Sequence, residues 1–129
     1  HTPIRRQRQM CIRDRGCAAA NASLDLLQQN PEQFRGFESR HRSHLEQLQS
    51  HPKVKHCRLT GTVAAFDLNV SGDAGYLNPA GPTIKRIAFE HGVFLRPLGQ
   101  VVYLLPPLCI SDDQLTQCYC AITAALDQV

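Results

Sequence analysis

Residues 92–122 read GVFLRPLGQVVYLLPPLCISDDQLTQCYCAI and hold the clearest structural signals of the chain. Two short apolar runs, Val93–Leu95 and Val101–Leu105, have the length of strands and are separated by a tight connection. Pro106 and Pro107 end the second run, because proline has no N–H group to donate to a sheet. This half of the segment therefore predicts two strands.

The second half of the segment predicts a helix. Ser111 and Gln114 have the spacing of a capping box, and Asp112 and Asp113 suit the positive end of a helix dipole. An apolar face then follows at helical spacing, which indicates an amphipathic helix that packs on a core. This face consists of Leu115, Cys118, Tyr119, Ile122, Ala125 and Leu126.

Two helices are expected further upstream. Residues 17–29 are rich in Ala and Leu, which favour helix. Asn30 and Pro31 are expected to cap and begin a second helix that continues to about Ser50. The apolar face of this second helix is formed by Phe34, Phe37, His41, Leu45 and Leu48.

Extended segments and a third helix are expected between these two parts. Residues 54–68 predict a strand, a bend at Gly61, and then either a second strand or the continuation of the first. The glycines and prolines of 69–82 predict a loop, after which Pro82 opens a short helix that ends before Gly92. Short strands without regular βαβ spacing predict an α+β fold, with a short antiparallel or mixed sheet and helices packed on one face.

Residues 1–15 differ from the rest of the chain. They contain five arginines and one acidic residue, although the net charge of all 129 residues is only +3. The string MCIRDR, residues 10–15, resembles the translation of a sequencing-library adapter, so we expect an adapter-derived or disordered tail. The alternative is a basic arm that binds nucleic acid.

Composition indicates one ordinary globular domain, since 43% of the residues are hydrophobic and 19% are charged. No run approaches the roughly 20 apolar residues of a membrane span, and no signal peptide is expected. The six cysteines are irregularly spaced, which favours reduced thiols and a cytoplasmic location. The histidines lack partners at ligand spacing, so we expect no metal site and solvated side chains at His41, His44, His51 and His56.

Arg96 is the most conspicuous candidate for a binding residue. It lies between apolar residues in VFLRPL, and Pro97 biases its backbone to an extended conformation. A guanidinium group that cannot lose its charge needs an acceptor, and a substrate carboxylate can supply two parallel hydrogen bonds. The alternative is a structural ion pair, or a side-chain stem packed flat with its head in water. Tyr103 is expected to pack in the sheet, with a role in the site as the second interpretation.

Residues 92–122 resemble the C-terminal end of class III pyridoxal-phosphate aminotransferases, and the RPLG and YLLPP strings are the most specific part of this resemblance. The resemblance extends over about residues 16–129. It implies linking helices over 16–50 and the small C-terminal domain of a fold-type I transferase over 51–129. It also implies a homodimer that binds small-molecule substrates, without nucleic acid or membrane partners.

The resemblance also implies a reaction and a site. The matching family members transfer an amino group from S-adenosylmethionine to 8-amino-7-oxononanoate in biotin synthesis. Arg96 occupies the position that holds the substrate carboxylate, and Tyr103 matches a tyrosine near the same pocket. The family's cofactor-binding lysine lies upstream of the matching region, so this chain alone is expected to be inactive. The alternatives are a different class III aminotransferase, or a non-enzymatic binding domain.

Overall fold

The computed structural model describes residues 3–70 and 78–129, with side chains from residue 13 onward except 33 and 34. It divides into two compact units, His1–Arg35 and Gly36–Val129. The first unit contains α1 (Pro3–Gln29) and α2 (Pro31–Arg35). Helix α1 begins far upstream of the expected start at Cys17, because Arg and Gln favour helix and no glycine or proline interrupts residues 4–15. The origin of residues 1–15 stays a prediction.

The second unit begins with α3 (Phe37–Gln49). A single helix is expected over 31–50, but the structure divides it at Gly36. Helix α3 buries Phe37, Leu45 and Leu48 in the core of the second unit. Helix α3 therefore belongs to the second unit, and the expected boundary after residue 50 stays a prediction.

Three antiparallel strands form one sheet in the order β1 (Val54–Thr60), β2 (Val63–Leu68) and β3 (Val101–Leu104). The bend expected at Gly61 is confirmed, and of the two alternatives for the residues after it the structure has a second strand, paired antiparallel with the first. Gly61 has a φ of 56°, which glycine adopts without steric cost. Buried residues of β2 and β3 face one another as the pairs Ala64–Leu104 and Phe66–Val102. One face of this sheet is therefore apolar.

The strand expected over Val93–Leu95 is not formed. This segment buries Val93 and Leu95 in the core but does not join the sheet. Its apolar composition is therefore explained by core packing and not by strand pairing. The strand expected at 101–105 is confirmed as β3. Asp73, in the loop that the sequence predicts over 69–82, lies outside the described residues.

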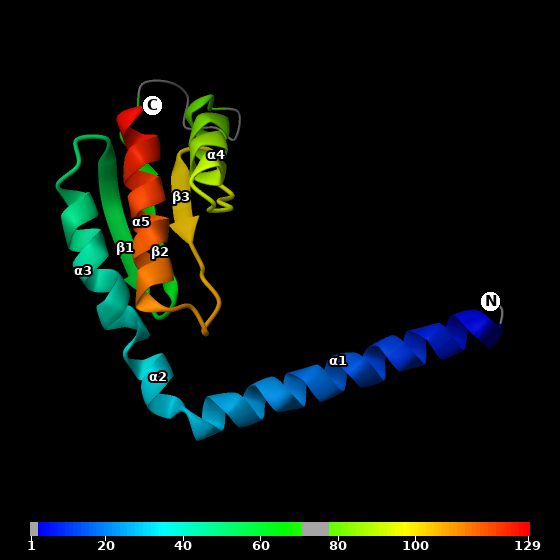
Figure 1. Cartoon of the computed structure of the whole chain (residues 1–129). Coiled ribbons are helices and arrows are strands. Elements are labelled where there is room, and N and C mark those ends of the chain that lie inside the picture. The colour runs from blue at the N-terminus through cyan, green and yellow to red at the C-terminus, as the bar shows by residue number, and fades with distance from the viewer. Residues whose placement is uncertain (1–2, 71–77) are drawn as a thin grey trace. The chain divides into compact units, whose positions relative to one another are not determined.

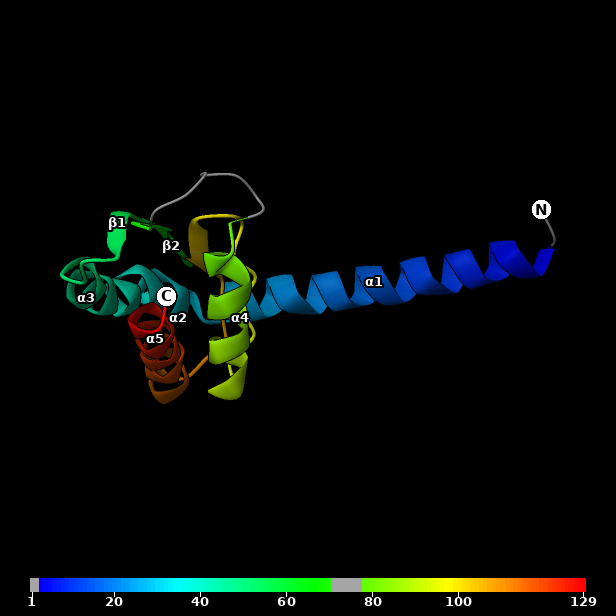
Figure 2. The ribbon, with the colours of Figure 1, turned by 90° about the horizontal axis from the view of Figure 1, so that it is seen from above.

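The remaining helices are α4 (Ala80–Glu90) and α5 (Asp112–Asp127), and both lie on one side of the sheet (Figure 2). Helix α3 packs against β1, and α5 contacts both α3 and α4 (Figure 1). The core lies between the apolar sheet face and these helices, which confirms the expected α+β arrangement. None of the described helices is long and apolar enough to cross a membrane.

The expectation of solvated histidines is wrong for His41. This side chain is completely buried, and its Nδ1 shares a 2.7 Å hydrogen bond with the hydroxyl of Tyr119 on α5. The Nε2 atom of His41 has no hydrogen-bond partner among the described residues. His41 occupies the apolar face of α3 one turn after Phe37, so the helical periodicity outweighs its polarity.

Candidate functional site

The segment between α4 and β3 carries Arg96 on an alternating pattern of burial. Val93 and Leu95 are buried, whereas Phe94 and Arg96 are exposed. In an extended backbone, successive side chains point to opposite sides, so anchoring Val93 and Leu95 in the core turns Arg96 outward. The core therefore determines the direction of the Arg96 side chain.

Hydrogen bonds fix both ends of this segment. At its start, the N–H of Val93 donates to the carbonyl of Ala88 at 2.8 Å, and the Gln117 side chain donates to the carbonyl of His91 at 3.2 Å. At its end, Leu98 and Val101 exchange backbone hydrogen bonds of 2.8 and 3.0 Å. The backbone that carries Arg96 is thus held to α4, α5 and β3.

Arg96 and Tyr103 line the same cleft, which has a volume of about 490 Å³. We call it the apolar cleft, because most of its walls are hydrophobic. The apolar walls include Phe94, Leu95, Leu104, Leu105, Pro106 and Ile110. The polar residues that line it are Arg96, Tyr103, Gln114, Gln117 and Cys118.

Tyr103 reaches the apolar cleft from β3, where it pairs with Ala65 of β2 and is half-buried. Tyr103 thus packs in the sheet as expected and also lines the cleft, and its role in a binding site stays a prediction. The structure brings the two predicted site residues together, although they are seven positions apart and lie in different elements.

Arg96 has no ion-pair or hydrogen-bond partner within the part of the chain that the structure describes. Other arginines do have partners: Arg40 pairs with Asp112, Arg58 with Asp67, and Arg86 with Glu90. The structural ion pair considered from the sequence is thus not found among the described residues. An exposed guanidinium group beside an apolar cleft can bind the carboxylate of a ligand.

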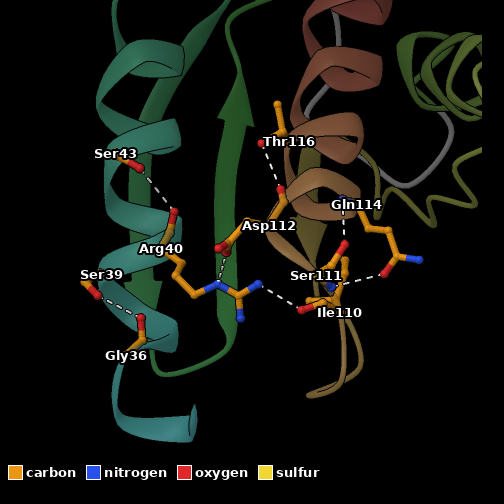
Figure 3. Close-up of polar contacts among 9 residues, drawn as sticks. All are labelled: Gly36, Ser39, Arg40, Ser43, Ile110, Ser111, Asp112, Gln114 and Thr116. Carbon is orange, nitrogen blue, oxygen red and sulfur yellow. Dashed lines mark hydrogen bonds and ion pairs between the residues drawn. The ribbon is translucent and has the colours of Figure 1, made fainter. Parts of the chain in front are cut away.

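The first turn of α5 forms one wall of the apolar cleft and is held by α3 (Figure 3). Ser111 and Gln114 form the expected capping box, in which the Gln114 N–H donates to the Ser111 hydroxyl at 3.2 Å. Arg40 of α3 donates to the Asp112 carboxylate at 2.5 Å and to the Ile110 carbonyl at 2.8 Å. Ile110 and Gln114 line the cleft, so Arg40 positions this wall without touching the cleft itself.

Sequence reasoning missed Gln114, Gln117 and Cys118 as residues of the cleft. Their spacing of three and four residues places them on one face of α5. This helical spacing is the feature of the sequence from which their shared position could have been predicted. Burial raises the pKa of the Cys118 thiol, so this group is a neutral wall of the cleft at neutral pH. The described cysteines, from Cys17 onward, are all free thiols, and no cluster of metal-ligating side chains occurs in the described residues.

Comparison with known proteins identifies relatives over most of the chain. The model of the family "Aminotransferase class-III" matches residues 15–126. A Synechococcus elongatus protein named adenosylmethionine-8-amino-7-oxononanoate aminotransferase is 48% identical over 114 residues, covering 88% of this chain and 27% of that protein. A protein of the same name from Geobacter sulfurreducens is 32% identical over 112 residues. The chain thus spans about a quarter of the length of these curated relatives.

Solved structures support the same assignment. A transaminase described with L-alanine has a TM-score of 0.74 and 26% identity, covering 86% of this chain and 27% of that one. An omega transaminase from Pseudomonas jessenii in complex with PMP has a TM-score of 0.71 and 25% identity, covering 81% of this chain and 24% of that one. The family match over residues 15–126 and the shared fold lead to one conclusion: this chain belongs to the class III aminotransferases.

Proposed function

We propose that the chain is the C-terminal part of a longer aminotransferase that converts 8-amino-7-oxononanoate into 7,8-diaminononanoate, with S-adenosylmethionine as amino donor, in biotin biosynthesis. The relatives at 48% and 32% identity are named for this reaction. The structural observation that carries the proposal is Arg96, an exposed cation that lines an apolar cleft without an acidic partner among the described residues.

The chemistry of the proposed substrate matches this cleft. The substrate is an aliphatic chain that ends in a carboxylate. A guanidinium group can hold a carboxylate through two parallel hydrogen bonds, and apolar walls favour contact with methylene groups over water. In this proposal Arg96 binds the carboxylate, Phe94, Leu104 and Leu105 contact the aliphatic chain, and Tyr103 is a second substrate contact.

Pyridoxal 5'-phosphate is the proposed cofactor of the complete enzyme, in which it would act as an electron sink. The lysines of this chain do not fit its covalent attachment. Lys53 donates to the carbonyls of Leu126 and Val129, and Lys85 lies over the Phe94 ring. Lys55 lies on β1, opposite Asp67 of β2. We therefore assign substrate binding, and not cofactor attachment, to the residues of this chain.

The complete enzyme is proposed to be a cytoplasmic homodimer that acts on small molecules. The apolar side chains that remain exposed on the second unit support contact with further protein, since exposed apolar patches mark interaction surfaces. They include Phe89, Phe94, Leu98 and Leu105, with exposed fractions from 53% to 69%. The basic arm that binds nucleic acid stays the alternative for residues 1–15.

The proposal can be tested in an enzyme that joins residues 16–129 of this chain to the upstream part of the Synechococcus elongatus relative. The variant Arg96→Met is expected to raise KM for 8-amino-7-oxononanoate roughly 30- to 100-fold, the value of a bidentate pair between charged groups. Arg96→Lys should give an intermediate KM. Lysine keeps the positive charge but lacks the planar guanidinium group that makes two parallel hydrogen bonds. Arg42→Met is the matched control, because Arg42 pairs with Glu38 on α3 and does not line the apolar cleft.

The methyl ester of the substrate sharpens this experiment, because it removes the charge that Arg96 is proposed to bind. With the ester, the native and Arg96→Met enzymes should have similar KM values. Equal KM values for the free acid would contradict the role of Arg96. Equal turnover of substrates with and without a carboxylate by the native chimera would favour a different class III aminotransferase.

The chain alone is predicted to be inactive. When it is mixed with pyridoxal 5'-phosphate and passed through gel filtration, no visible absorbance should remain with the protein, since none of its lysines fits attachment. Absorbance that stays with the protein and is lost in Lys53→Met would show that the assignment of Lys53 to the C-terminal carbonyls is wrong.

A further inference from the structure

Arg96 lines two cavities. It lines the apolar cleft, and it also lines a smaller cavity of about 320 Å³ between the start of α4 and the turn that follows Arg96. We call this second space the Lys85–Arg96 cavity. Its lining residues are Gly81, Pro82, Lys85, Arg96, Pro97 and Gly99. Arg96 is the one residue that these two linings share.

The Lys85–Arg96 cavity has two cations and no acidic residue in its lining. Among the described residues neither Lys85 nor Arg96 has an ion-pair partner, whereas Arg86, the neighbour of Lys85 on α4, contacts Glu90 at 2.5 Å. Two like charges that face one cavity repel each other, and an anion between them removes this repulsion. The charge of the cavity is thus complementary to an anionic ligand.

Lys85 of α4 also contacts Phe94, two positions before Arg96. The Lys85 Nζ atom lies 5.6 Å from the centre of the Phe94 ring, which is within the range of a cation–π contact. Lys85 and Phe94 line a neighbouring cavity together with Arg86 and Glu90, whereas Lys85 and Arg96 line the Lys85–Arg96 cavity. Lys85 therefore lies between these two cavities, and it shares only the second with Arg96.

The backbone around the cavity is closely packed. A Cβ atom placed on Gly81 would lie 3.4 Å from the Gly99 carbonyl oxygen and 3.7 Å from Pro97 Cβ. Helix α4 and the 97–99 turn thus approach each other directly, which fixes the positions from which Lys85 and Arg96 extend. A site that holds its cations on two fixed elements needs little rearrangement to bind.

We propose that Lys85 is a second cation for the substrate carboxylate, which lies in the Lys85–Arg96 cavity while the aliphatic chain extends along the apolar cleft. The inference rests on the proposed role of Arg96 and adds a residue to it. The ligand class is a monocarboxylate with a long aliphatic chain. Neither Lys85 nor its cavity is assigned by the sequence motifs around Arg96.

The test measures binding of nonanoate, below its micelle concentration, to the full 129-residue chain by NMR titration. Lys85→Met and Arg96→Met are each expected to raise Kd about tenfold, the loss of one charge-assisted contact. Lys85→Arg should keep the native Kd, because it restores the cation. Arg42→Met is the matched control, because Arg42 pairs with Glu38 on α3 and lines neither cavity, so it should leave Kd unchanged. Nonanamide, which lacks the negative charge, should bind all variants equally.

Each outcome decides between the two proposals. If Arg96→Met weakens binding and Lys85→Met does not, the inference on Lys85 is overturned and the role of Arg96 stands. If neither variant changes Kd, or if the native chain does not bind nonanoate, the Lys85–Arg96 cavity is not a carboxylate site. The kinetics of the chimeric enzyme then test the proposed function independently, because they measure the substrate itself. A circular-dichroism melt of each variant shows that it remains folded.

Discussion

The α3 side and the α4 side of the second unit differ in the contacts that several of their cations make. On the side of α3 and β1, Arg40 contacts Asp112 at the start of α5, and Lys53 contacts the carbonyls of Leu126 and Val129. On the side of α4 and the 91–107 segment, Arg86 pairs with Glu90, but Lys85 and Arg96 have no ion-pair partner among the described residues.

Both sides bury apolar side chains, such as Leu45 and Leu126 on the first and Ile87 and Leu95 on the second, but large exposed ones gather on the second. Phe89, Phe94 and Leu105 are exposed there. Groups that the chain leaves unsatisfied are those available to a ligand or to further protein. Both sides therefore contribute to stability, and the second also offers groups for binding. Three predictions test this division, in order of decreasing effect.

The largest expected effect comes from a change in the buried core of the first side. Leu126 has no exposed surface, so Leu126→Ala should lower the free energy of unfolding by about 2–5 kcal/mol, the cost of a cavity in a closely packed core. Leu105→Ala is the matched control, because the same side-chain atoms are removed at a residue that is 60% exposed. Urea unfolding measures the free energy of unfolding of both variants. Equal decreases in this free energy would contradict the assignment of Leu126 to the stabilising core.

A smaller effect is expected from the cations. Arg40→Met should lower the free energy of unfolding by about 1–2 kcal/mol, because it removes hydrogen bonds to Asp112 and to the Ile110 carbonyl from a side chain that is 23% exposed. Arg96→Met should change it by less than about 0.5 kcal/mol, as surface substitutions do. A larger loss of stability in Arg96→Met than in Arg40→Met would assign a structural role to Arg96.

The smallest effect concerns pH. Burial, followed by the nearby charges of His44 and Arg40, lowers the pKa of His41 below the ordinary value of 6.5. The unfolded chain therefore takes up this proton first, so the contribution of His41 to stability is complete above about pH 6.5 and declines as the pH falls towards the lowered pKa. Urea unfolding over this range should show a smaller decline in His41→Asn. An equal decline would show that other groups cause it.

The sequence determined the elements with strong local signals. The capping box at Ser111 and the apolar periodicity after it predicted α5, and Gly61 predicted the turn between β1 and β2. These features depend on neighbouring residues, which a sequence contains directly. The RPLG and YLLPP strings also predicted the family and the two site residues, Arg96 and Tyr103, which the structure places in one cleft.

The errors arose where distant residues decide the outcome. Val93–Leu95 has the composition of a strand, but the sheet contains no position for it, and its side chains pack in the core instead. His41 is buried because Tyr119, 78 positions away, supplies its hydrogen bond. Local propensity is a weak prior that tertiary packing overrides at such positions.

The sequence by itself determined the family, the main helices and the identity of Arg96 as a candidate for carboxylate binding. Only the tertiary structure decided that Arg96 lacks an acidic partner among the described residues, that Gln114, Gln117 and Cys118 share its cleft, and that Lys85 shares its second cavity. The physical reason is that binding depends on the charged groups and apolar surfaces that have no partner after folding. Which groups these are can be known only when the contacts of all the other residues in the folded chain are known.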